Sequence, residues 1–105
     1  MGKYKVEYLP LAMKDMVDIA AYISGELCNP DAAQALAEQF VSCGDGLAKY
    51  PYRNGVYVPA KKLKHEYRRV LVGHYGMYYW VDEEARIVTI ARVIYQRRDI
   101  DRLLD

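Results

Sequence analysis

The chain has few residues that bind metals or form disulfides, with two cysteines and two histidines among 105 residues. Cys28 and Cys43 lack the C-x-x-C spacing of zinc and redox motifs, and they fall in predicted helix or cap positions. We expect both to be reduced, partly buried thiols. His65 and His74 have no partner at metal-ligand spacing. The sequence therefore predicts no metal site and no cofactor.

Long apolar runs are also missing. No stretch approaches the roughly 20 apolar residues that span a bilayer, and residues 1–10 do not form a signal peptide. We therefore expect a cytoplasmic protein. The length leaves room for one domain, residues 1–105, built around one hydrophobic core.

Acidic residues are nearly absent from the middle of the chain. Lys49–Tyr78 holds seven basic residues and one acid, Glu66, whereas Met1–Ala48 holds three basic and seven acidic residues. Such an asymmetry suggests an anionic partner for the basic part. The alternative is a loop made soluble by its lysines, and arginines on the next strand favour the anionic partner. The residues concerned are Lys61, Lys62, Lys64, Arg68 and Arg69.

The second half of the chain contains three runs rich in Val, Ile, Tyr and Trp, which suit a pleated surface. They are Glu66–Val72, Tyr75–Val81 and Arg86–Ile94. The connections between them are two and four residues long, too short for a parallel crossover. The sequence therefore predicts an antiparallel three-strand meander.

The first half of the chain predicts a strand and two helices. Tyr4–Leu9 alternates as a half-buried strand does, and Pro10 ends it. A first helix is predicted to bury Met13, Met16, Val17, Ala20, Ile23 and Leu27, with Lys14, Asp15 and Asp18 on its solvent side.

Asn29-Pro30-Asp31 has the composition of a helix start, with a capping Asn, proline at the first helical position and an acid in the first turn. The second helix is expected to run to about Ala48, with Ala33, Leu36, Phe40, Cys43 and Leu47 on its buried face. The short loop between the helices predicts an antiparallel hairpin.

The predicted class is α+β. It consists of a small antiparallel sheet, formed by the N-terminal strand and the C-terminal meander, with the helical hairpin on one face. The opposite face is expected to be left for a ligand.

Several short motifs follow one another over nearly the whole chain. They are Tyr4-Lys5-Val6-Glu7-Tyr8, Ala12-x-x-Asp15-x-x-x-Ile19, Tyr22-Ile23, Pro30-x-x-Ala33, Leu47-x-x-Tyr50-Pro51, Arg68-Arg69-Val70, Tyr75-Gly76-Met77-Tyr78-Tyr79, Ile90-x-x-Val93-Ile94-Tyr95-x-Arg97-Arg98-Asp99 and Leu103-Leu104. In this order the motifs resemble those of the RelE/ParE toxin superfamily. The resemblance implies a toxin of a type II toxin–antitoxin pair, as in plasmid stabilisation systems. It also implies a cognate antitoxin whose otherwise disordered segment wraps the toxin.

The superfamily contains members with different activities. RelE-like members cut messenger RNA on the ribosome, whereas ParE-like members bind and stop DNA gyrase without being hydrolases. A nuclease needs a proton acceptor, a proton donor and cations for the phosphorane. The resemblance implies Arg69, Tyr95 and Arg97 as the catalytic candidates, with His74 as a possible base in a predicted turn.

One departure favours the gyrase alternative. The nucleases usually carry an arginine after the tyrosine that opens the second meander strand, but here Gly76 follows Tyr75. A nucleic-acid-binding relict of the same fold is the third alternative. In each case the cations are expected to converge on one uncovered side of the sheet, where target or antitoxin docks. They are Lys61, Lys62, Lys64, Arg68, Arg69, Arg92, Arg97 and Arg98.

Overall fold

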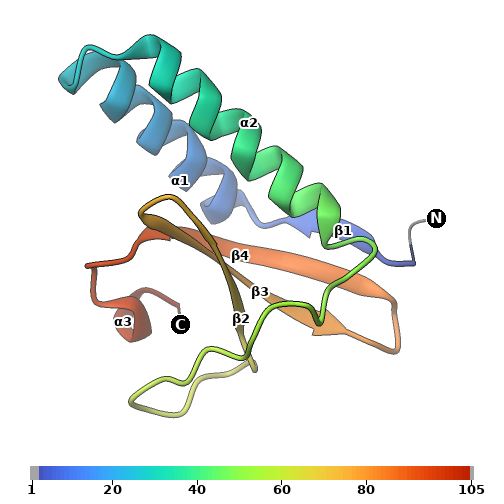
Figure 1. Ribbon diagram of the computed structural model, residues 1–105. Helices are drawn as coiled ribbons and strands as arrows, with labels where there is room; N and C mark the ends of the chain where they lie inside the picture. Colours follow the sequence, from blue (N-terminus) through green and yellow to red (C-terminus); the bar gives the residue numbers. More distant parts are fainter. Residues whose placement is uncertain (1–2, 105) are drawn as a thin grey trace.

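The computed structural model describes residues 3–104 and contains a four-stranded sheet with a helical hairpin on one side (Figure 1). The elements in chain order are β1 (Lys5–Tyr8), α1 (Pro10–Ala21), a π-helical turn η1 (Tyr22–Glu26), α2 (Pro30–Gly46), β2 (Arg68–Val72), β3 (Tyr75–Asp82), β4 (Ile87–Tyr95) and α3 (Ile100–Leu104). The predicted α+β class and strand–helix–helix–strands order are confirmed.

The sheet has the strand order β1-β4-β3-β2. β2, β3 and β4 form the predicted antiparallel meander. β1 instead pairs in parallel with Ile87–Ile90 of β4, so the sheet is mixed and the expectation of a fully antiparallel sheet was wrong at this edge. The intervening helical hairpin and meander supply far more chain than the dozen residues that a parallel return requires.

The α1–α2 hairpin covers one face of the sheet, as predicted (Figure 1). Asn29 caps α2 by accepting a hydrogen bond from the Ala32 amide. The predicted stripe of α2 is confirmed: Ala33, Phe40 and Leu47 are buried, and Leu36 and Cys43 pack against the core. α2 ends at Gly46, two residues before the expected end.

The predicted buried stripe of α1 is partly wrong. Met13 and Val17 are 56% and 66% exposed, and Leu27 is also exposed. The helix turns Ala12, Met16 and Ile19 toward the core, so Met16 of the predicted stripe is confirmed, and Ala12 and Ile19 replace Met13 and Val17. These residues have the same four- and three-residue spacing, so periodicity alone could not choose between the two faces.

The face of the sheet opposite the hairpin was expected to be left for a ligand, but other parts of the chain lie against it. α3 and the long connection between α2 and β2 lie against it (Figure 1). They build a second apolar cluster with the sheet, made of Tyr67, Tyr78, Ala91, Ile94, Ile100 and Leu104. The connection contains no strand at residues 56–58, only an isolated bridge between Val56 and Arg68.

Candidate functional site

A groove of about 880 Å³ opens between the tip of the helical hairpin and one end of the sheet. Its walls are largely apolar, with Ile19, Ile23, Leu27 and Leu36 on the helical side. Three aromatic rings gather at the strand ends: the Tyr95 centroid lies 5.6 Å from that of Tyr75 and 6.4 Å from that of His74. Charged side chains at the groove are Asp15, Asp18, Arg92 and Arg98.

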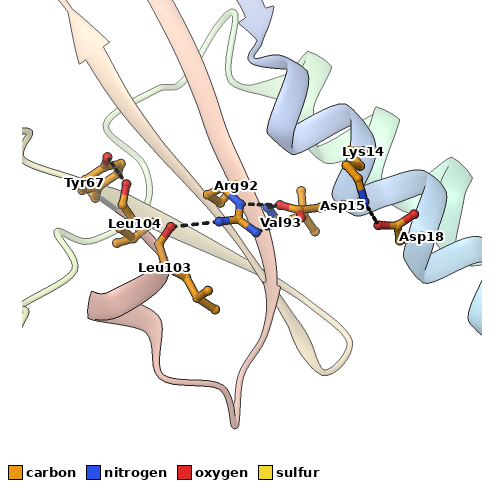
Figure 2. A network of polar contacts seen from close by, with 8 residues as sticks. All are labelled: Lys14, Asp15, Asp18, Tyr67, Arg92, Val93, Leu103 and Leu104. Carbon is orange, nitrogen blue, oxygen red and sulfur yellow. Dashed lines mark hydrogen bonds and ion pairs between the residues drawn. The ribbon is translucent and has the colours of Figure 1, made fainter.

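A bidentate ion pair between Asp15 and Arg92 lies in this groove (Figure 2). Arg92 Nε donates to Asp15 Oδ2 at 2.7 Å and Nη2 donates to Oδ1 at 3.0 Å. Asp15 Oδ2 also accepts a hydrogen bond from the Val93 amide at 2.9 Å. Val93 lies beyond Ile90, the last residue of β4 that pairs with β1. The side chains of Asp15 and Arg92 are only 14% and 18% exposed, and the hydrogen bond that Arg92 donates to Asp15 raises the pKa of Arg92. The carboxylate thus joins α1 to the uncovered edge of β4.

Arg92 also anchors the C-terminal helix. Its Nη1 donates to the Leu103 carbonyl at 2.9 Å, so that one guanidinium holds both α1 and α3 (Figure 2). Each of the three guanidinium nitrogens of Arg92 thus donates to an internal partner, which gives the residue an architectural role. Its predicted role as a target-binding cation stays a prediction.

Two tyrosines attach the rest of α3 to the far face. Tyr67 Oη donates to the Leu104 carbonyl at 3.1 Å, and Tyr57 Oη donates to Asp101 at 2.5 Å. The Ala60 amide donates to the other Asp101 oxygen. Burial and the hydrogen bond to Asp101 raise the pKa of Tyr57 to about 12. The Tyr57 and Ala60 hydrogen bonds lower the pKa of Asp101, so this attachment persists to a more acidic pH than an ordinary aspartate would allow.

The predicted cations of β2 are held by aromatic rings. Arg68 lies over Tyr52, 4.9 Å from Cζ to the ring centroid, and donates to the Asn54 carbonyl at 2.7 Å. Arg69 lies over Tyr57 at 5.5 Å. Both arginines are half-buried. The three predicted lysines, Lys61, Lys62 and Lys64, are exposed in the connection that precedes β2.

Arg97 and Arg98 lie at the other end of the sheet. The Gln96 amide donates to the His74 carbonyl at 2.9 Å, which places the turn after β4 beside the β2–β3 turn. Arg68 begins β2, four residues or about 13 Å along the strand from that turn. The predicted cations therefore form two separate groups, with Arg92 between helices, and the expectation that all converge on one surface was wrong.

The three catalytic candidates are not brought together. Tyr95 lies in the groove on the helical side, whereas Arg69 contacts Tyr57 on the opposite face. In the sheet register, Arg69 pairs with Tyr78 and Tyr95 pairs with Tyr75, three residues or about 10 Å away along the strands. Arg97 is near Tyr95 in sequence but far from Arg69.

Gly76 is required where it stands. A Cβ at this position would lie 2.8 Å from Cε1 of Tyr78, whose side chain is fully buried. An arginine at position 76 would therefore have to displace a core tyrosine. The space that a phosphate-binding arginine needs is occupied by Tyr78 in this chain.

Asp15 is the residue that sequence analysis missed, since it was assigned to the solvent side of α1. Its position in the sequence could have indicated this role, because Asp15 lies on the same face of α1 as the core residues Ala12, Met16 and Ile19. Among residues 3–104, no group of three or more His, Cys, Asp or Glu side chains is arranged to hold a metal ion.

Comparison with known proteins identifies the family. The family model of the ParE toxin of the type II toxin–antitoxin system parDE matches residues 6–100. The chain belongs to this family. It is therefore a ParE-family toxin of a type II toxin–antitoxin system, and the resemblance inferred from its motifs is confirmed.

Solved structures of toxin–antitoxin complexes share the fold of this ParE-family chain. The chromosomal ParDE system from P. aeruginosa has a TM-score of 0.70 at 13% identity, covering 89% of this chain and 96% of that one. The toxin–antitoxin complex RelBE2 from Mycobacterium tuberculosis has a TM-score of 0.62 at 21% sequence identity, and the match covers 89% of this chain and 98% of that one. The archaeal RelE–RelB complex from Pyrococcus horikoshii OT3 has a TM-score of 0.63 at 16% sequence identity, and the match covers 91% of this chain and 98% of that one.

A search of curated proteins gave no significant match. In residues 3–104, no helix is long and apolar enough to cross a membrane.

Proposed function

We propose that this ParE-family toxin acts in the cytoplasm by binding and inhibiting DNA gyrase. The observation that carries this choice is the separation of the nuclease candidates: Arg69 and Tyr95 lie on opposite faces of the sheet. General acid–base cleavage of RNA requires its groups within hydrogen-bond reach of one phosphate. The Tyr78 ring over Gly76 also leaves no space for a further cation.

The proposed neutralising partner is an antitoxin segment that covers the groove. Exposed apolar side chains continue from the groove onto the hairpin, since Val17, Tyr22 and Leu27 are each more than half exposed. Contiguous exposed apolar surface of this kind marks an interaction site. The structures that share the fold were solved as toxin–antitoxin complexes, which supports an antitoxin as the occupant.

The experiment that tests the activity compares two targets in one culture. After induction of the chain in a bacterium, messenger RNA integrity and plasmid supercoiling are followed together. The proposal predicts loss of supercoiling with transcripts intact at early times. Rapid transcript cleavage with normal supercoiling would instead establish a ribosome-dependent endonuclease, which is the second candidate function.

Arg97→Ala is expected to relieve growth arrest while leaving the fold intact. Arg97 is exposed in the turn after β4, and no ion pair holds it among the described residues. Loss of one desolvated interface cation typically weakens binding about tenfold or more. The readout is plating efficiency at equal expression, and Lys14→Ala, on the outer side of α1, is the control that retains toxicity.

Arg69→Ala tests the other group of cations in the same assay. We expect it to relieve growth arrest as well, provided that circular dichroism shows an intact fold after loss of the contact with Tyr57. If neither arginine variant alters toxicity, the cationic groups do not contact the target.

A further inference from the structure

A flat aromatic stack lies on the far face of the sheet, away from the helical hairpin. The His65 imidazole lies parallel to the Trp80 indole, with ring centroids 3.6 Å apart and planes 3° apart. The buried Tyr67 ring meets both rings edge-on, at 5.9 Å and 5.8 Å. His65 itself is exposed. One side of the imidazole is therefore fixed on Trp80, and its other side faces solvent.

Three lysines precede His65 in the same connecting segment. Lys61, Lys62 and Lys64 lie within four residues of His65 and are exposed. Leu63, between them, packs against the same apolar cluster as Trp80, which keeps the lysine segment on this face. Two acids lie nearby: Asp101 accepts hydrogen bonds from Tyr57 Oη and the Ala60 amide and also interacts electrostatically with Lys61, and Glu66 is exposed.

We propose that this stacking surface, defined as His65, Trp80, Lys61, Lys62 and Lys64, binds single-stranded nucleic acid. A base stacks on the outer side of the His65 ring, and the lysines contact the adjoining phosphates. Exposed rings flanked by cations bind single strands in this way with little dependence on sequence. Duplexes bind more weakly because their base faces are covered by neighbouring base pairs.

Binding to single strands goes beyond gyrase inhibition and does not depend on it. Contact with an acidic peptide is the competing explanation for the lysines. It would use their charge but not the solvent-facing side of the imidazole, which is why the stack favours a nucleic acid.

The chain provides its own reporter, because Trp80 is its one tryptophan. The purified chain, residues 1–105, is titrated at about 50 mM salt with a 15-nucleotide oligo-dT, with oligo-rU of the same length and with a duplex DNA. Trp80 emission and oligonucleotide anisotropy are recorded. We expect one or both single strands to change Trp80 emission and to bind at least fivefold more tightly than the duplex.

Two variants separate stacking from charge. His65→Leu keeps an apolar cover on Trp80 but removes the π-face, and should weaken binding roughly fivefold or more with an unchanged salt dependence. Lys62→Ser should reduce the slope of log K against log salt by about 0.7. Lys14→Ser, which removes one charge from α1 on the other side of the sheet, should leave both affinity and slope unchanged.

Several results would overturn the proposal. These are no binding of either single strand, equal binding of the duplex, or wild-type affinity in His65→Leu. Polyglutamate that changes Trp80 emission as strongly as oligo-dT would assign the surface to acidic peptides. If His65→Leu does not fold, the proposal is tested by the two other results: tighter binding of single strands than of the duplex, and a smaller salt slope in Lys62→Ser. Absence of either result contradicts it. Gyrase is absent from this assay. A negative result would therefore overturn the nucleic-acid proposal without bearing on the proposed inhibition of gyrase.

Discussion

Asp15→Ala is expected to destabilise the chain by about 3 kcal/mol, because it leaves the Arg92 guanidinium and the Val93 amide without their partner in a largely buried place. Urea unfolding followed by circular dichroism measures the loss as a lower midpoint at an unchanged slope. Since Arg92 also holds the Leu103 carbonyl, amide exchange in α3 should accelerate in the same variant.

Asp18→Ala is the matched control on the same helix. Asp18 pairs with Lys14 at 2.7 Å, but both side chains are more than half exposed. Exposed pairs of this kind contribute little to stability because water screens them, so we expect a much smaller loss than for Asp15→Ala. Equal losses in the two variants would show that the Asp15–Arg92 pair does not join α1 to the sheet.

Gly44→Ala is expected to lower the free energy of unfolding by about 2–3 kcal/mol. A Cβ at this position of α2 would overlap Tyr8 Oη and lie 3.0 Å from Tyr8 Cζ and 3.3 Å from Cδ1 of Ile90, all in the main core. Tyr8 Oη is buried, and no hydrogen-bond partner is found for it among residues 3–104. Tyr8→Phe should therefore recover part of the loss when combined with Gly44→Ala.

Gly46→Ala is the control, two residues further along α2. Nothing lies within 4 Å of a Cβ there, so the change should be neutral or should add up to about 1 kcal/mol of stability. Thermal melts of Gly44→Ala, of its combination with Tyr8→Phe and of Gly46→Ala test the close approach of α2 to β1. A Gly44→Ala variant as stable as Gly46→Ala would contradict it.

The parts of the fold that sequence predicted are those fixed by local patterns. The Asn29 cap and the stripe through Phe40 determined α2, and the two- and four-residue connections fixed the meander. α1 was harder because its apolar residues lie on several sides: Met13 and Val17 are exposed while Met16 is packed. An amphipathic pattern orients a helix only when one side is polar.

The candidate site was less predictable because distant contacts define it. Asp15 meets Arg92 across 77 residues, and Tyr57 meets Asp101 across 44. Neither pairing leaves a periodic signal in the sequence. The covering of the far face by α3, and the separation of Arg97 from Arg69, follow from such contacts. By contrast, the order of short motifs was sufficient to indicate the toxin family.

The activity of the ParE-family chain is tested most directly with purified components. The chain is added to DNA gyrase, relaxed plasmid and ATP, and the supercoiled product is resolved by gel electrophoresis, with translating ribosomes and a reporter messenger RNA assayed in parallel. The proposal predicts that supercoiling stops at stoichiometric toxin while the transcript stays intact. Normal supercoiling beside a cleaved transcript would contradict it.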